Sequence, residues 1–292
     1  MRKYKILKAN RDFVFLNINV RNTKGSRKKR TIGQLGKGKL SLGFFKYELY
    51  EQCSEACSEK LSYEIAKILK KPCARIEFAK DAKGELGIIS FLFVDYYQMH
   101  VDAKDLFNKP DFDRKDFLTI SSIENFLKTY GEMEFNKFIG LMVFDALVGE
   151  TDRHEENWGL LKTGNQYQLS PMYDTSCNLL REFKNTEHAQ KYYDGTKSFE
   201  NYILKSKVFI FREDNKKQYT HFELIEDLYK KYPNETLKEI KKLKRITERK
   251  IERILNKLPE QMIEEEHKEY IKKYVIRRKE ILFNIIRGGE VK

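Results

Sequence analysis

Apolar and polar positions alternate along the first third of the chain. Residues 4–20 carry apolar side chains at spacings typical of one or two strands, and residues 73–79 and 86–94 predict two more. The last two are separated by Asp81–Glu85, whose glycine favours a hairpin turn. Ser54–Lys70 instead shows an apolar stripe with helical spacing. The pattern therefore predicts a small lobe of strands with one helix.

The rest of the chain has mainly helical spacing. Residues 95–116 are polar and irregular, and we interpret them as a hinge; a hairpin is predicted at 158–169, and residues 181–220 show no assignable pattern. The predicted helices cover residues 121–130, 135–148, 221–232, 235–258 and about 262–287. We expect an α+β protein with a small β-rich N-terminal lobe at residues 1–96 and a mostly helical C-terminal lobe at residues 97–292.

Three oxygen-bearing side chains follow the predicted buried helix 135–148. Asp152 lies on the loop after that helix, Asn157 comes five residues later, and Asp174 follows the hairpin. Phosphoryl transfer requires a carboxylate that receives the proton of the attacking hydroxyl, together with an amide oxygen and a second carboxylate that hold magnesium. Magnesium favours such hard oxygen ligands, with phosphates and water completing its octahedron. We predict Asp152 as the catalytic base and Asn157 and Asp174 as ligands of Mg²⁺.

Glycines upstream of this stretch favour close approach of the backbone to a ligand. Three lie within six residues: Gly33, Gly36 and Gly38. Their backbone N–H groups suit phosphate binding, although a tight turn explains the same cluster. Lys46 ends an aromatic-rich strand, so its amine is expected beneath this glycine loop. Glu59, in the first turns of the predicted helix, is its expected ion-pair partner, with Glu55 as the alternative.

Four further residues near Asp152 invite interpretation. His154, whose ordinary pKa lies near neutrality, is a catalytic candidate that polarises the attacking hydroxyl or contacts the γ-phosphate; a structural hydrogen bond explains it equally. Trp158 is expected to pack behind the loop. Asp145 is expected to rigidify the loop, and Arg153 to meet either a phosphate or an internal carboxylate.

Composition narrows the class of protein. With 40% hydrophobic and 13% aromatic residues among 292, the chain is globular and not disordered. The net charge of +13 suits an anionic partner, so nucleic-acid binding through a basic surface stays open, although a solvated lysine-rich surface is the commoner explanation. The most apolar run, residues 87–94, is too short for a membrane span. We expect a cytoplasmic protein without membrane contact.

The cysteines do not suggest a structural metal. The four are Cys53, Cys57, Cys73 and Cys177. Cys53 and Cys57 are one helical turn apart, but no second pair of ligands follows as a zinc site requires. We expect reduced thiols that pack as small apolar side chains.

The stretch Phe144–Leu161, with its Asp-Arg-His-x-x-Asn core, and Leu169–Asp174 resemble the HipA-like serine/threonine kinases of bacteria. Upstream, Lys46 and the helix that begins near Ser58-Glu59 resemble that family's nucleotide lysine and lobe-bridging helix. The resemblance covers most of the chain. It implies a two-lobed kinase fold, with Asp152 as base, Asn157 and Asp174 as Mg²⁺ ligands, and Lys46 on the ATP phosphates.

The resemblance also implies an activity. We expect a kinase that uses ATP and Mg²⁺ to phosphorylate a serine or threonine hydroxyl of a protein, and we weigh the toxin of a toxin–antitoxin system, with an antitoxin or regulatory partner, as a further expectation. The same Asp-Arg-His-x-x-Asn pattern occurs in phosphoinositide kinases, so a lipid or small-molecule acceptor stays open. A nucleotide-binding pseudokinase and a nucleic-acid-binding module are the remaining alternatives.

Overall fold

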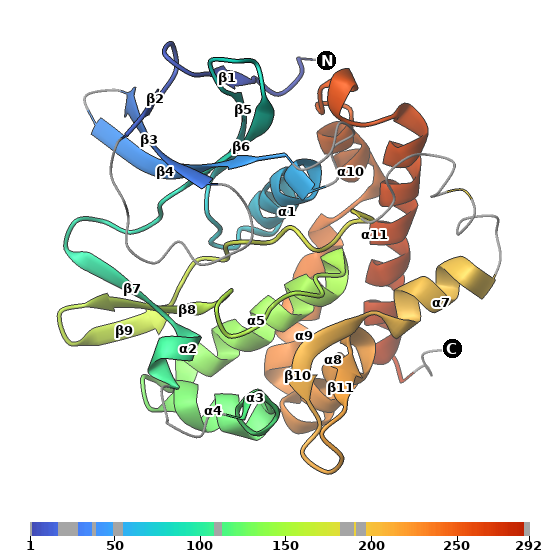
Figure 1. The fold of residues 1–292 in the computed structure, drawn as a ribbon. Helices are drawn as coiled ribbons and strands as arrows, with labels where there is room; N and C mark the ends of the chain where they lie inside the picture. Colours follow the sequence, from blue (N-terminus) through green and yellow to red (C-terminus); the bar gives the residue numbers. More distant parts are fainter. Residues whose placement is uncertain are drawn as a thin grey trace.

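The computed structural model describes residues 2–16, 29–36, 39–48, 55–107, 113–181, 190 and 197–288. Two parts of unlike architecture are stacked in Figure 1, a curled sheet above and a set of helices below and to the right. The expected α+β class and the β-rich N-terminal lobe are therefore confirmed.

The upper part is a six-stranded sheet with the order β1-β5-β6-β4-β3-β2. Its strands are β1 (Leu7–Lys8), β2 (Val14–Phe15), β3 (Lys29–Gly36), β4 (Lys39–Tyr47), β5 (Ile76–Lys80) and β6 (Leu86–Phe91). All neighbours are antiparallel except β1 and β5, which are parallel. The strands expected in residues 4–20, 73–79 and 86–94 are present, though shorter than predicted.

Strands β5 and β6 carry buried apolar side chains on both faces of this sheet. Helix α1 (Glu55–Leu69) lies against one face, where Phe78 and Ile88 join its apolar stripe. The other face curls around a smaller, mostly aromatic cluster. This cluster includes Ala79 and Ile89, the residues that follow Phe78 and Ile88 in their strands. Successive side chains of a strand point to opposite faces, so adjacent apolar residues serve two cores at once.

A three-stranded sheet connects the upper part to the helices. Strand β7 (Gln98–Asp102) pairs with β8 (Gly159–Thr163), and β8 pairs with β9 (Gln166–Leu169). The hairpin predicted at 158–169 is confirmed. The interpretation of residues 95–116 as irregular is wrong, because they contain β7 and the short helices α2 (Ala103–Leu106) and α3 (Arg114–Phe117). Strand β7 lies at a sheet edge with its side chains only partly buried, so its apolar signal is weak.

Helices dominate the C-terminal part. They are α4 (Ile120–Lys128), α5 (Glu132–Val148), α7 (Lys197–Lys205), α8 (His221–Lys231), α9 (Pro233–Lys242), α10 (Glu248–Leu255) and α11 (Glu265–Ile285), with the 3₁₀ turns η1 (Leu243–Arg245) and η2 (Glu260–Met262). The single helix predicted over 235–258 is wrong: Ile246 leaves the helical conformation, and Thr247 caps α10. In the unassigned stretch, α7 precedes the hairpin of β10 (Lys207–Phe211) and β11 (Gln218–Thr220).

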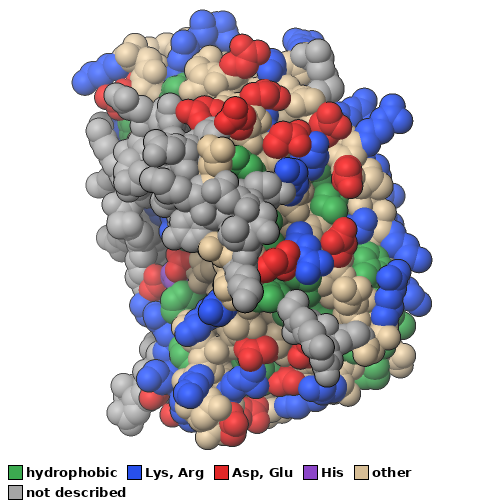
Figure 2. Space-filling view, turned by 90° about the vertical axis from the view of Figure 1, so that its right-hand side faces the viewer, with side chains coloured by type: hydrophobic (Ala, Val, Ile, Leu, Met, Phe, Trp, Pro, Cys, Tyr) green, Lys and Arg blue, Asp and Glu red, His purple; other side chains and the backbone are tan. Residues whose placement is uncertain are grey.

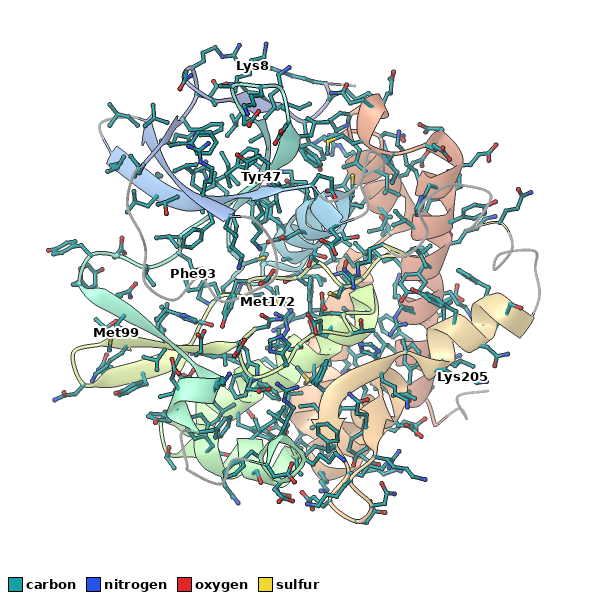
Figure 3. The ribbon with its side chains drawn as sticks, in the orientation of Figure 1. Lys8, Tyr47, Phe93, Met99, Met172 and Lys205 are labelled. Carbon is teal, nitrogen blue, oxygen red and sulfur yellow. The ribbon has the colours of Figure 1, made fainter. Side chains whose placement is uncertain are left out.

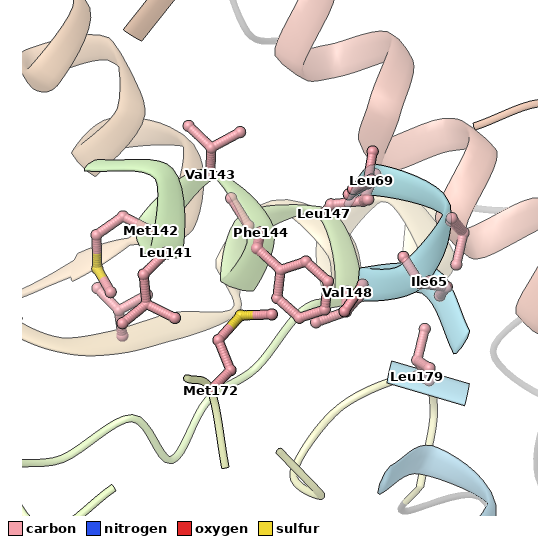
Figure 4. Close-up of a cluster of buried hydrophobic side chains, with 14 of the residues drawn as sticks. Ile65, Leu69, Leu141, Met142, Val143, Phe144, Leu147, Val148, Met172 and Leu179 are labelled. Atoms are coloured by element: carbon pink, nitrogen blue, oxygen red, sulfur yellow. The ribbon is translucent and has the colours of Figure 1, made fainter. Parts of the chain in front are cut away.

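One large core runs from α1 through the C-terminal helices. Figure 4 shows Ile65 and Leu69 of α1 beside Leu147 and Val148 of α5, with Met172 close to Phe144. Burial of this apolar surface is the main stabilising contribution to such a fold. Because α1 and α5 share the core, the helix that carries Glu59 and the helix that leads to Asp152 are held in one packed unit.

The molecular surface gives little support to a single basic patch on the face shown in Figure 2. Lysine and arginine side chains are interspersed there with aspartate and glutamate. None of the helices in the described ranges combines the length and apolar character that a membrane span requires.

Candidate active site

Lys46, on β4 of the sheet, contacts both helix α1 and the segment after β9. Its Nζ donates to Glu59 Oε1 of α1 at 2.8 Å and to Asp174 Oδ1 at 3.0 Å. Lys46 and Asp174 are 128 residues apart in sequence. Figure 3 labels Tyr47, which follows Lys46 at the end of β4, and below it Met172, which lies two residues before Asp174. The predicted pair of Lys46 and Glu59 is present, and the alternative partner Glu55 instead pairs with Arg181.

The environment of Lys46 keeps its amine charged. Burial alone would lower the pKa of this lysine, but the carboxylates of Asp174 and Glu59 outweigh burial and raise it. The side chains of Lys46 and Glu59 are almost fully buried, whereas 37% of the Asp174 side chain is exposed. The Lys46 amine is therefore held by the buried carboxylate of Glu59, while the carboxylate of Asp174 is partly accessible to solvent.

The loop that carries Asp152 begins where α5 ends. Gly149 closes the helix in the left-handed conformation, at a φ of 75°. The buried carboxylate of Glu150 then accepts a hydrogen bond from the backbone N–H of Asp152 at 2.9 Å. Asn157 Nδ2 donates to the Asp152 carbonyl at 2.7 Å. The Asp152 carbonyl therefore fixes the orientation of the Asn157 amide within the same loop.

Arg153 ties this loop to the segment that carries Asp174. Its guanidinium forms a two-point ion pair with Asp145, with both N···O distances 3.0 Å. A third nitrogen, Nη1, donates to the carbonyls of Asn157 and Tyr173 at 2.9 and 2.8 Å. Of the two expectations for Arg153, the internal carboxylate is therefore the one present. Asp145 stabilises the loop through this arginine, as expected.

His154 lies beside the two polar residues of the loop. Its Nε2 is 3.3 Å from Asn157 Nδ2 and 3.9 Å from Asp152 Oδ2. Its ring packs edge-on against Phe209 of β10. These contacts place His154 at the site, while its catalytic role stays a prediction. Trp158 is buried against Phe138, as expected.

The predicted glycine loop is only partly described. Gly33 lies inside β3 opposite Leu42 of β4, so its assignment to a loop is wrong. Gly36 is the last residue of β3, and Gly38 falls outside the described residues. Gly33 and Gly36 therefore both belong to strand β3. Phosphate binding by these glycines stays a prediction.

The oxygen atoms at the site suit a hard cation. Asn157 commits its Nδ2 to the Asp152 carbonyl, which leaves the amide oxygen for a cation, and Asp174 offers a partly exposed carboxylate. Within the described residues, no cluster of three or more histidine, cysteine or acidic side chains could hold a metal by itself. One amide and one carboxylate match a magnesium site that substrate phosphates complete.

Sequence reasoning missed three residues next to Asp152. Glu150 and Asn178 are buried and hydrogen-bonded to each other at 2.9 Å. Burial raises the pKa of Glu150 to about 7. Cys177 donates from its Sγ to Asp152 Oδ2 at 3.6 Å, and burial raises the pKa of this thiol to about 12. Only their positions in the sequence indicate that these residues belong to the site. Glu150 lies just before the Asp-Arg-His motif, and Cys177 and Asn178 closely follow Asp174.

A cluster of aromatic rings from the segment after β6, from β7 and from the residue before Asp174 borders the site. Phe93 packs against His100 of β7 and Tyr173, with ring centroids 5.4 and 5.6 Å apart. Tyr173 also donates from its hydroxyl to Asp102 at 3.0 Å. Phe93 therefore connects the segment after β6 to β7 and to the segment that carries Asp174.

Comparison with known proteins supports a kinase-like fold. A family model described as the HipA-like C-terminal domain matches residues 21–264. The serine/threonine-protein kinase CtkA of Helicobacter pylori is 27% identical over 150 residues, which are 51% of this chain and 45% of that protein. The chain thus matches less than half the length of this curated relative.

Solved structures extend the likeness over nearly the whole chain. The crystal structure of the proinflammatory kinase CtkA from Helicobacter pylori has a TM-score of 0.78 at 19% identity and covers 97% of both chains. HipA of Shewanella oneidensis, solved with HipB and operator DNA, has a TM-score of 0.55 at 11% identity and covers 94% of this chain and 68% of that chain. At these identities the likeness shows a shared fold.

Proposed function

The chain belongs to the family of the HipA-like C-terminal domain, and from that membership and the geometry of its site we propose that it is an ATP- and Mg²⁺-dependent protein serine/threonine kinase. The observation that carries the proposal is the contact of Lys46 Nζ with both Glu59 and Asp174. A lysine fixed by a helix glutamate beside a metal-binding aspartate is the arrangement that holds the nucleotide phosphates in protein kinases.

Each polar residue then has a role. Lys46 binds the nucleotide phosphates and is positioned by Glu59. Asn157 and Asp174 hold Mg²⁺, whose charge, when it is bound with ATP, offsets the negative charge that develops on the transferred phosphoryl group. Asp152 orients the attacking hydroxyl and accepts its proton. Gly33, Gly36, Gly38 and Phe93 border the nucleotide, and His154 contacts the reacting phosphate.

The acceptor can be identified by mass spectrometry. The protein is incubated with ATP and Mg²⁺ in a lysate, and phosphosites are compared with those produced by the Asp152→Asn variant. We expect serine and threonine phosphosites, including any on the protein itself, that depend on Asp152. Circular dichroism checks that the variant remains folded. Phosphosites that persist in Asp152→Asn would contradict the assignment of the base.

Other acceptors give a different distribution of label. When radiolabelled ATP is offered with protein, lipid and small-molecule extracts, a lipid or small-molecule kinase moves the label to its own class only. A pseudokinase is stabilised by ATP–Mg²⁺ without moving the label. A nucleic-acid-binding module retains DNA or RNA with an affinity that falls steeply with salt and survives Asp152→Asn.

The structural neighbour from Shewanella oneidensis suggests a setting for this activity. That structure is described as a toxin–antitoxin system in which HipA is bound with HipB and operator DNA. By analogy we extend the proposal to a cytoplasmic toxin kinase held by a protein partner. Co-purification of a stoichiometric partner that suppresses phosphotransfer supports this extension, and an unpartnered, constitutively active kinase that cells tolerate contradicts it.

A further inference from the structure

A chain of buried hydrogen bonds joins α1 to the loop of Asp152, and Asn178 lies at its centre. The Asn178 side chain donates from Nδ2 to Glu150 Oε2 at 2.9 Å and accepts at Oδ1 from Ser62 Oγ of α1 at 3.2 Å. The Asn178 carbonyl accepts a second hydrogen bond from α1, from Ser58 Oγ at 3.0 Å. Ser58 and Ser62 flank Glu59 on the helix, so α1 is held to Asn178 next to the residue that pairs with Lys46.

The far end of this chain is the backbone of the catalytic loop. Glu150 Oε1 accepts from the Asp152 N–H at 2.9 Å, and Oε2 also accepts from the Cys177 N–H at 3.2 Å. Side chains of Ser62 and Glu150 are fully buried, and that of Asn178 is 3% exposed. Water therefore cannot readily replace these hydrogen bonds, and each broken one leaves a buried polar group unsatisfied.

Asn178 also reaches the turn after Asp174. Its Nδ2 donates to the Thr175 carbonyl at 3.1 Å. In this segment Asp174, Leu179 and Leu180 all adopt positive φ angles, between 50° and 64°. Non-glycine residues rarely adopt this conformation, which persists only where the surroundings impose it. The Asn178 amide is thus placed to hold a strained segment that carries a predicted magnesium ligand.

We propose that Asn178, through Glu150 and Ser62, is a positioning residue that sets the Asp152 loop relative to the Lys46–Glu59 pair. The inference rests on the proposed kinase function for its purpose, but the link itself does not depend on that function. Its amide contacts α1, the catalytic loop and the Asp174 turn, so its geometry bears on the alignment of hydroxyl, phosphate and metal. Small misplacements of such groups lower the rate of transfer more than they lower nucleotide affinity.

Kinetics of two single variants and one double variant test whether the link positions the reacting groups. Ser62→Ala removes only the hydroxyl contact to Asn178, and we expect a kcat about fivefold lower with an unchanged KM for ATP, as for loss of one buried hydrogen bond. Asn178→Asp turns the donor toward Glu150 into an acceptor, and we expect kcat to fall about a hundredfold. Adding Glu150→Gln restores a donor–acceptor pair of reversed direction with residue 178. It does not restore the hydrogen bonds of the Cys177 N–H and the Thr175 carbonyl, so we expect about a tenfold recovery and not a return to the parent rate.

Thr236→Val is the matched control. Thr236 is fully buried, and its hydroxyl donates to the Leu228 carbonyl at 3.1 Å in a different part of the helical core. We expect it to lower stability about as much as Ser62→Ala does and to leave kcat unchanged. An equal loss of kcat in Thr236→Val and Ser62→Ala, or no recovery in the Asn178→Asp/Glu150→Gln double variant, overturns the proposal.

Hydrogen exchange tests the link without any assay of activity. In Asn178→Asp we expect faster exchange of the amides in both 55–62 and 150–157, and in Thr236→Val we expect no change in either segment. Faster exchange confined to one segment, or to neither, overturns the link. If the parent protein transfers no phosphate to any acceptor, the kinase proposal fails while the exchange result still decides the link.

Discussion

Arg153 and Asp145 form a two-point ion pair in which both side chains are almost completely buried. Removal of one partner from such a pair leaves an uncompensated charge in the interior. The same guanidinium holds the carbonyls of Asn157 and Tyr173, so the pair determines how two segments of the site lie relative to each other.

We therefore expect Asp145→Asn to lower the free energy of unfolding by about 3–5 kcal/mol. Urea denaturation measures the effect. Asp116→Asn is the matched control, because Asp116 pairs with Lys216 at the surface, where loss of a pair costs about 0–1 kcal/mol. Equal losses in the two variants would show that the Asp145 pair is not special.

Lys46→Met should strongly lower the rate of nucleotide-dependent transfer. Removal of a cation that contacts the transferring phosphates is expected to lower kcat about 10²–10³-fold. Since Lys46→Met also leaves Glu59 buried without its partner, the double variant Lys46→Met/Glu59→Gln separates loss of folding from loss of function. Lys83→Met, at an exposed turn, is the control. Transfer at the parent rate by a folded double variant would refute the role of Lys46.

The buried His221 should make the fold sensitive to acid. Its Nε2 is 2.8 Å from the Glu150 carbonyl, and burial lowers its pKa from 6.5 to about 3. The unfolded chain therefore binds this proton at a higher pH than the folded one, and the stability that the neutral ring contributes is lost as pH falls from 6.5 toward about 3.

His221→Gln removes this titration. Between pH 7 and pH 4.5, we expect its unfolding free energy to fall by about 2–3 kcal/mol less than that of the parent. Urea titrations at the two pH values give the difference. Thr236→Val should keep the acid sensitivity of the parent. Identical pH dependence in His221→Gln and the parent would mean that His221 is not the group responsible.

Gly149→Ala should be far more harmful than Gly164→Ala. Both glycines have positive φ angles, which cost a side chain about 1–2 kcal/mol. A Cβ at Gly149 would also lie 2.0 Å from the Tyr274 hydroxyl, whereas nothing lies within 4 Å at Gly164. We expect Tyr274→Phe to recover part of the stability lost in Gly149→Ala, as measured by thermal unfolding. No difference between the two alanine variants would contradict the steric argument.

Local sequence patterns predicted much of this molecule because they act within single elements. The stripe of α1, the hairpin of β8 and β9 and the order of Lys46, Glu59, Asp152, Asn157 and Asp174 could all be read from the chain. The break after Arg245 could not, because Ile246 is fully buried and continues the apolar spacing of the helices on either side. Only the capping threonine that follows signals a new helix.

Contacts between distant residues account for most of what the sequence did not predict. Asn178 looks like an ordinary polar loop residue, and its importance arises only where Ser62 and Glu150 reach it from other elements. Strand β7 was missed because its pairing with β8 brings together residues about 60 positions apart. Gly33 was assigned to a loop because the residue type alone does not distinguish a glycine within a strand from a glycine within a turn.

The burial of β6 on both of its faces affects how the register of this strand in the sheet is specified. Where one face of a strand is polar, a slip of one residue exposes apolar side chains and is rejected. Ile88 and Ile89 are both apolar, so hydrophobicity discriminates poorly against such a slip. Gly87 supplies the missing selection, because a Cβ there would lie 2.2 Å from the Lys46 carbonyl. A strand shifted by one residue would place Leu86 or Ile88 at that point, and the side chain would collide with the Lys46 carbonyl. The absence of a side chain at Gly87 therefore favours the register of β4 and β6 in which Lys46 contacts Glu59.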